Sequence, residues 1–168
     1  MASPSDPLPE RTQVLAIDGP AGSGKTTLAS TLRLLQPCVV IHMDDLYDGW
    51  DGLDAGIAQV EAILAALAAG EPAGYRRYDW AAGAYAATVA IPATPLLVIE
   101  GVGAGGTERA PDCLVWMDAP AGVRRERALA RGDFGAPADQ RWEHWAALEA
   151  AHFARARTRE RADLVVEP

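Results

Sequence analysis

The most constraining feature of the sequence is a glycine-rich turn followed by a lysine and a threonine. Residues 19–26 match the pattern Gly-x-x-x-x-Gly-Lys-[Ser/Thr] at every fixed position. The turn lies between a short apolar segment, residues 12–18, and a segment with helical spacing, residues 26–35. Glycines let the backbone curl so that several N–H groups point at one anion, and the following helix adds its positive end. We therefore predict a phosphate-binding loop formed by Gly19, Ala21, Gly22, Ser23, Gly24, Lys25, Thr26 and Thr27.

Lysine occurs once in the chain, and it occupies the lysine position of this turn. The 15 basic residues are 14 arginines and Lys25. A compact, flexible ammonium can reach the β- and γ-phosphates of ATP, where a planar guanidinium would not fit. The neighbouring Thr26 offers a hydroxyl to Mg²⁺. The turn therefore predicts ATP and Mg²⁺ as cofactors, with Lys25 as a catalytic residue and Thr26 as a metal ligand.

Apolar and helical segments alternate along the chain. We expect strands at residues 12–18, 38–43, 96–99, 114–117 and 162–166, and helices at 26–35, 54–69, 119–131 and 137–161. Near-continuous apolar runs are typical of strands buried on both faces of a parallel sheet. The pattern predicts an α/β fold, a three-layer α/β/α sandwich with a five-stranded parallel sheet, in one domain over residues 1–168.

Two regions are expected to be less regular. Residues 1–11 contain prolines and acids and are predicted to form a short mobile tail. Residues 71–95 are predicted to contain a loop rich in Tyr, Arg and Trp, followed by an extended segment at 85–91.

Acidic residues follow several of the expected strands. Asp44 and Asp45 come after the second strand and Glu100 after the third. Ligands of parallel sheets bind beyond the carboxyl ends of the strands, and phosphoryl transfer needs a metal near the phosphates and a group that takes the proton of the attacking hydroxyl. We expect Asp44 to be the catalytic base, with Asp45 supporting it, and Glu100 to hold Mg²⁺ through water. The alternative for each is a helix-capping or solvated acid.

Two arginine-containing segments are candidates for the acceptor site and for a lid. Residues 75–80 read Tyr-Arg-Arg-Tyr-Asp-Trp, in which aromatic faces can stack on a base while Arg and Asp bind polar groups. Arg124, Arg127 and Arg131 share one face of the expected helix 119–131. We expect a short Arg-rich lid with Arg127 and Arg131 as catalytic residues; the alternative is a solvated helix face. The candidate substrate-binding residues are Asp45, Tyr47, Arg76, Arg77, Tyr78, Asp79 and Trp80.

Other polar and aromatic residues have a simpler structural interpretation. The two cysteines lie in apolar runs, which is typical of buried free thiols, and together with the three histidines they form no zinc spacing. We assign structural roles to Asp18, Cys38, His42, Cys113, Trp142, His144, Trp145 and His152.

The composition excludes some partners. The net charge is -8 at pH 7, whereas a protein that binds duplex nucleic acid normally carries a basic face. No apolar run approaches the length of a membrane span, and the N-terminus has no signal-peptide pattern. We therefore expect a cytoplasmic protein, a monomer or homodimer, with a small-molecule partner and with neither nucleic acid nor membrane as a partner.

The sequence resembles the P-loop nucleoside and nucleotide kinases, and among them the uridine kinase group. Residues 18–28 resemble their phosphate loop, 44–47 their Asp-x-Phe-Tyr segment, 78–80 their Tyr-Asp-Phe segment, 98–101 their strand-end Glu-Gly, and 161–166 their closing Ala-Asp strand. The resemblance implies a P-loop NTPase-type fold, Asp44 as catalytic base, a nucleoside pocket around Asp79 and a metal near Glu100.

The acceptor of the phosphoryl group is left open by these observations. A nucleoside is the first candidate. A nucleoside monophosphate is the second, because residues 18–25 equally resemble cytidylate kinases, and Arg76, Arg77 and the lid arginines would then clamp its phosphate. A non-nucleoside alcohol is the third. Asp44 favours an alcohol, since a phosphate acceptor is already ionised and needs no base. A different class of function is a nucleotide-binding regulator without phosphotransfer.

Overall fold

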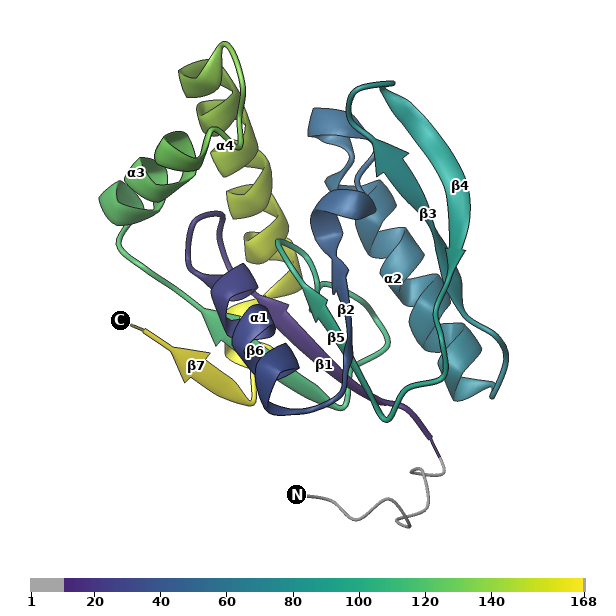
Figure 1. The fold of residues 1–168 in the computed structure, drawn as a ribbon. Helices are drawn as coiled ribbons and strands as arrows, with labels where there is room; N and C mark the ends of the chain where they lie inside the picture. The colour runs from purple at the N-terminus through teal and green to yellow at the C-terminus, as the bar shows by residue number, and fades with distance from the viewer. Residues whose placement is uncertain (1–10, 168) are drawn as a thin grey trace.

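A five-stranded parallel sheet forms the centre of the structure, a computed structural model that describes residues 11–167 (Figure 1). The strands lie in the order β2-β5-β1-β6-β7 and all pair in parallel. Their bounds are β1 Gln13–Asp18, β2 Val39–His42, β5 Leu96–Glu100, β6 Cys113–Met117 and β7 Leu164–Val166. The predicted five-stranded parallel sheet is confirmed.

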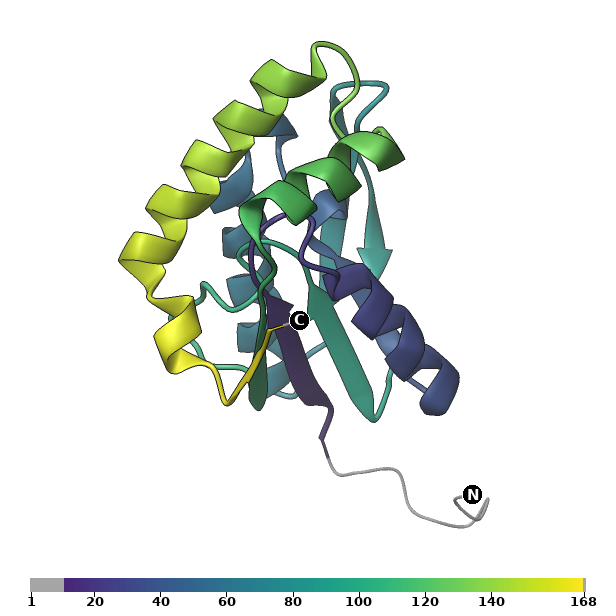
Figure 2. The same cartoon turned by 90° about the vertical axis from the view of Figure 1, so that its left-hand side faces the viewer.

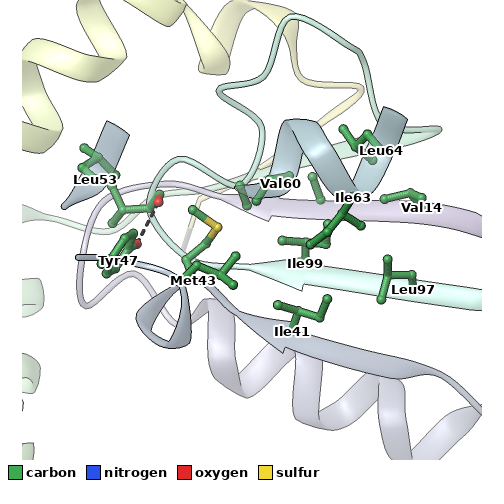
Figure 3. Close-up of a cluster of buried hydrophobic side chains, with 14 of the residues drawn as sticks. Val14, Ile41, Met43, Tyr47, Leu53, Val60, Ile63, Leu64, Leu97 and Ile99 are labelled. Atoms are coloured by element: carbon green, nitrogen blue, oxygen red, sulfur yellow. Dashed lines mark hydrogen bonds between the residues drawn. The ribbon is translucent and has the colours of Figure 1, made fainter. Parts of the chain in front are cut away.

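Helices cover both faces of this sheet, which gives the predicted three layers (Figure 2). Helix α1, Lys25–Leu35, packs on one face; α2, Leu53–Ala68, and α4, Ala138–Ala156, pack on the other. Along β5, Leu97 and Ile99 join the core beneath α2 and α4, whereas Val98 joins the core beneath α1. Figure 3 shows the larger cluster, where side chains of α2 meet those of β1, β2 and β5. Burial on both faces explains the uninterrupted apolar runs of the sequence.

The helix expected over residues 137–161 is confirmed except for a break at Arg157. Helix α4 ends at Ala156, Arg157 has the left-handed φ of 49°, and the short α5 spans Thr158–Arg161. The chain turns there because Asp163 exchanges two hydrogen bonds with Leu114 and β7 joins the sheet beside β6. Tertiary pairing thus overrides a helical pattern that continues in the sequence.

Residues 74–90 form an antiparallel hairpin, so the extended segment expected at 85–91 is confirmed, whereas part of the expected loop is a strand. Strand β3, Gly74–Asp79, pairs with β4, Ala84–Ala90. The Tyr78 and Tyr85 rings lie 5.5 Å apart, and the Arg76 guanidinium lies 4.4 Å from the centre of the Tyr85 ring. Cross-strand aromatic and cation contacts of this kind stabilise a hairpin whose side chains are largely exposed.

Three further helical elements complete the fold. Two short 3-10 helices, η1 Met43–Asp45 and η2 Gly49–Asp51, follow β2, and helix α3 spans Ala121–Arg131. Of the expected mobile tail, residues 1–10 lie outside the described residues, and Arg11 is paired with Asp112 at 2.5 Å. Among the helices of residues 11–167, none is both long and apolar enough to cross a bilayer.

The central strand β5 provides a test of the core. Leu97→Ala should lower the free energy of unfolding by about 2–5 kcal/mol, because the Leu97 side chain is completely buried in the larger core cluster. Leu34→Ala makes the same chemical change where the side chain is 88% exposed and should change it by less than about 0.5 kcal/mol. Urea denaturation of both variants measures the difference, and equal losses would contradict the assigned core.

Candidate active site

A cavity of about 350 Å³ lies beyond the carboxyl ends of β1, β2 and β5. Nine residues singled out from the sequence line it: Ala21, Gly22, Lys25, Thr26, Asp44, Tyr47, Trp80, Glu100 and Arg131. The other candidates lie outside the lining: Gly19, Ser23, Gly24, Thr27, Asp45, Arg76, Arg77, Tyr78, Asp79 and Arg127. The first group comes from segments far apart in the chain, as expected for a site at the end of a parallel sheet.

The glycine-rich turn curls around the Lys25 ammonium. Nζ of Lys25 donates to the carbonyls of Gly19 and Pro20 at 2.7 and 2.8 Å and lies 3.5 Å from Oγ of Ser23. Burial lowers the pKa of this ammonium, and the negative charge of Asp18, among others, opposes that shift. Gly24, with φ of 104°, turns the chain into α1, so the helix begins with its N-terminus at the loop.

The carboxylate of Asp18 holds two loops together. It accepts N–H groups of Gly19 at 2.7 Å, Gly103 at 2.8 Å and Gly105 at 2.9 Å, and it is fully buried. Burial raises the pKa of Asp18 to about 6, although the three backbone donors and Lys25 act in the opposite direction. The phosphate loop is thereby bound to the loop that follows β5, in keeping with the structural role expected for Asp18.

Glu100 lies at the centre of a small polar cluster. Its Oε1 accepts the Thr26 hydroxyl at 3.1 Å and lies 2.5 Å from Nδ1 of His42, the residue paired with it in the neighbouring strand. The hydrogen bond to Glu100 raises the pKa of His42. His42 had been expected to be merely structural, yet it directly contacts the candidate metal-organising acid.

The oxygens of this cluster fit Mg²⁺. Magnesium prefers oxygen ligands and retains several waters, so it is usually bound by few protein groups together with substrate phosphates. Within residues 11–167 there is no cluster of three His, Cys, Asp or Glu side chains able to hold a metal by itself. The Thr26 hydroxyl and the Glu100 carboxylate, side by side at the phosphate loop, are the residues that would hold the ion.

Asp44 and Asp45 face different surroundings. The Asp44 carboxylate is open to the cavity, yet the cavity walls exclude enough water that desolvation, followed by the charge of Glu100, raises its pKa. Asp45 points away and pairs with Nε of Arg77 at 3.0 Å. An unpaired carboxylate of raised pKa in a cavity is suited to accept a proton.

Aromatic side chains form a further part of the cavity wall. Trp50 stacks on Phe134 with ring centres 5.3 Å apart and meets Trp80 edge-on at 5.2 Å, while Tyr47 and Trp145 lie 4.9 Å apart. Sequence patterns did not single out Trp50 or Phe134, and they assigned Trp145 to the core. Helical spacing identifies the buried face of α4 but cannot separate core from cavity wall, which explains why Trp145 was assigned to the core.

Of the hairpin residues, only Trp80 reaches the cavity. Its Nε1 donates to the backbone carbonyl of Asp44 at 2.9 Å, so the hairpin tip is bound to the segment that carries the candidate base. Tyr78 packs edge-on against Trp80 at 5.2 Å, and Oδ1 of Asp79 accepts the N–H groups of Ala81 and Ala82 within the turn. These residues shape the hairpin that presents Trp80.

The arginines of α3 are in three different environments. Arg131 lines the cavity and is paired with Asp133, which also lines it, at 2.5 Å. Arg127 is exposed, with Nη1 3.5 Å from the carbonyl of Gly22. Arg124 is partly buried and bonded to Glu149 of α4 at 3.2 Å. Two of these three arginines are therefore held in ion pairs, and the pair formed by Arg124 is the buried one.

Comparison with known proteins identifies the fold. No protein-family model matches the sequence, and no curated protein matches it. A structure described as a possible uridine kinase from Bacillus stearothermophilus has a TM-score of 0.59 at 23% identity, covering 94% of this chain and 89% of that one.

Two further structures match over similar shares. A candidate fructose transport system kinase from Silicibacter sp. TM1040 has a TM-score of 0.55 at 24% identity, covering 96% and 92% of the two chains. Shikimate kinase from Acinetobacter baumannii, in complex with shikimate, has a TM-score of 0.56 at 16% identity, covering 95% and 85%. This chain has the fold of the P-loop kinases, as its sequence resemblance implied.

The close approach of the phosphate loop to α3 leads to a prediction. A Cβ added at Gly22 would lie 2.4 Å from the Arg124 carbonyl oxygen, and the φ of 80° is unfavourable for alanine by about 1–2 kcal/mol. Gly22→Ala should therefore lower Tm by several degrees. Gly122→Ala is the matched control, because nothing lies within 4 Å of its added Cβ. Thermal unfolding of both variants measures this, and an unchanged Tm for Gly22→Ala would refute the described packing.

Proposed function

We propose that this protein transfers the γ-phosphoryl group of ATP to the hydroxyl group of a small molecule, and that the acceptor is a nucleoside. The observation that carries the proposal is the meeting of Lys25, Thr26, Glu100 and Asp44 in one cavity. The first three suit a metal-bound triphosphate, and the fourth suits an attacking alcohol. The similar solved structures are described as kinases of different acceptors, which supports phosphotransfer more strongly than any one acceptor.

In the proposed mechanism the acceptor hydroxyl binds beside Asp44. Its oxygen attacks the γ-phosphorus, the bond from that phosphorus to the β–γ bridging oxygen breaks, ADP leaves, and the hydroxyl proton passes to the Asp44 carboxylate. Lys25 and the loop N–H groups bind the β- and γ-phosphates, and Arg131 approaches the transferred group from the lid. Thr26 and, through water, Glu100 would hold Mg²⁺, which would neutralise phosphate charge. Catalysis comes from position and charge, without a covalent intermediate.

The charges around the acceptor support a neutral alcohol over a monophosphate. Among the described residues that line the cavity, Arg131 is the only arginine, and Asp133 already pairs with it. Arg76 lies over the Tyr85 ring and Arg77 pairs with Asp45, so neither provides the phosphate clamp that a nucleotide acceptor would need. The aromatic wall suits a flat base.

The first experiment is a screen for acceptor-dependent ADP release. The protein is incubated with Mg²⁺ and ATP and a coupled assay compares nucleosides, nucleoside monophosphates and amino-sugar alcohols. Turnover with nucleosides supports the proposal. Turnover with monophosphates alone would overturn the acceptor assignment, and the absence of both turnover and ATP binding would overturn phosphotransfer itself.

Replacing the single lysine tests the phosphate site. Lys25→Ala should lower kcat by about 10²–10³-fold, because it removes the cation that balances charge developing on the transferred phosphoryl group. Circular dichroism checks that the variant is folded. Wild-type turnover in a folded Lys25→Ala protein would contradict the assignment of residues 19–26 as the triphosphate loop.

Replacing the candidate base should affect chemistry more than ATP binding. Asp44→Asn should reduce kcat by about 10²–10⁴-fold while the Kd for ATP stays the same or decreases, since a negative charge near the phosphates is removed. Asp48→Asn, an exposed acid outside the cavity, is the control. Because a base must be ionised and the pKa of Asp44 is raised, wild-type activity should fall with decreasing pH already above the ordinary carboxyl value of 3.8. An unchanged kcat in Asp44→Asn would exclude it as the base.

A further inference from the structure

We propose that Glu149 of α4, together with Arg124 of α3, is a positioning residue that fixes the phosphate loop for nucleotide binding. The inference rests on the proposed function, because it concerns the loop assigned there to ATP. The sequence pattern did not single out Glu149, which is an acidic residue on the buried face of α4.

The carboxylate of Glu149 reaches the apex of the loop. Its Oε2 accepts the N–H of Ala21 at 2.9 Å, while Nη1 of Arg124 donates to the carbonyl of Ala21 at 3.1 Å. Nη1 of Arg124 also lies 3.2 Å from Oε1 of Glu149. Both main-chain polar groups of one loop residue are therefore bound by an ion pair that joins two helices distant from it in sequence.

The location of this acid argues for a role beyond simple packing. Glu149 is only 3% exposed, and its negative charge acts to raise the pKa of Lys25 in the phosphate loop, against the larger effect of burial. A carboxylate beside a polyphosphate site opposes anion binding by its charge alone. Arg124 offsets that charge. The hydrogen bond that the Ala21 N–H donates to Glu149 holds the apex of the loop in one defined conformation before the nucleotide binds. Preorganisation of this kind strengthens binding because less ordering remains to be done.

Helix α4 is held in the position that this contact requires. Trp145 lies four residues before Glu149 and therefore on the same face of the helix. It packs against Tyr47 at 4.9 Å and Trp50 at 6.4 Å, in the aromatic wall of the cavity. The helix thus contacts the acceptor part of the cavity through Trp145 and the phosphate loop through Glu149.

The test compares Glu149→Ala, Glu149→Gln and Arg124→Ala with the wild type, using calorimetry with Mg²⁺ and ATP. Glu149→Ala should raise the Kd for ATP about tenfold or more while kcat at saturating substrates changes by less than about threefold. Glu149→Gln retains an oxygen for the Ala21 N–H and should recover most of the affinity. Glu143→Ala removes an exposed acid from the same helix and should bind ATP as the wild type does.

The sign of the effect separates this role from simple electrostatics. If Glu149 acted only as a nearby charge, its removal would tighten ATP binding. Affinity that is unchanged or improved in Glu149→Ala would overturn the inference, as would a double mutant with Arg124→Ala whose loss equals the sum of the single losses.

A second readout does not depend on nucleotide. Hydrogen exchange at the Ala21 amide should accelerate in Glu149→Ala and in Arg124→Ala and stay slow in Glu143→Ala, and equal rates in all four proteins would overturn the inference. If Glu149→Ala does not fold, Arg124→Ala and Glu149→Gln carry both measurements. A wild type that binds no ATP overturns the proposed function, whereas a wild type that binds ATP with unaffected variants overturns only the role of Glu149.

Discussion

The buried carboxylate of Asp18 is the interaction on which the site depends. It binds N–H groups of Gly19 in the phosphate loop and of Gly103 and Gly105 in the loop after β5. A buried charge is tolerated only when it is hydrogen-bonded on several sides, so the two loops have little freedom to separate. Since Glu100 ends the strand that leads into the second loop, the Asp18 carboxylate helps to hold the candidate triphosphate loop beside the candidate metal-organising acid.

The layered fold and the phosphate loop could be predicted from the sequence because local patterns determine both. Buried strands require continuous apolar runs, and the loop requires glycines at fixed spacing before Lys25. Of the hairpin, the extended segment at 85–91 was predicted, but β3 and its pairing with β4 were not, because these strands are largely exposed and show little alternation. The end of α4 at Ala156 was missed for a related reason: the pairing of Asp163 with Leu114, distant in sequence, decides where the helix stops.

Prediction of individual site residues depended on whether a residue's role is local. Lys25, Thr26, Asp44 and Glu100 lie at strand ends or in the loop, and the structure brings them to one cavity. The aromatic wall and Glu149 are contributed by elements that meet only in three dimensions. No spacing rule distinguishes Trp145, which faces the cavity, from Trp142, which belongs to the core, because both lie on the buried face of one helix.

The hydrogen bonds of Lys25 have a practical consequence. Its Nζ is bonded to the carbonyls of Gly19 and Pro20, so a phosphate oxygen that approaches must compete with main-chain acceptors for the same protons. No other side chain in the sequence carries a primary amine. The nitrogen resonance of the Lys25 side chain would therefore report on that competition from a single atom. The rate at which this side chain reacts with an acylating reagent selective for side-chain amines would report on occupancy of the site in the same way.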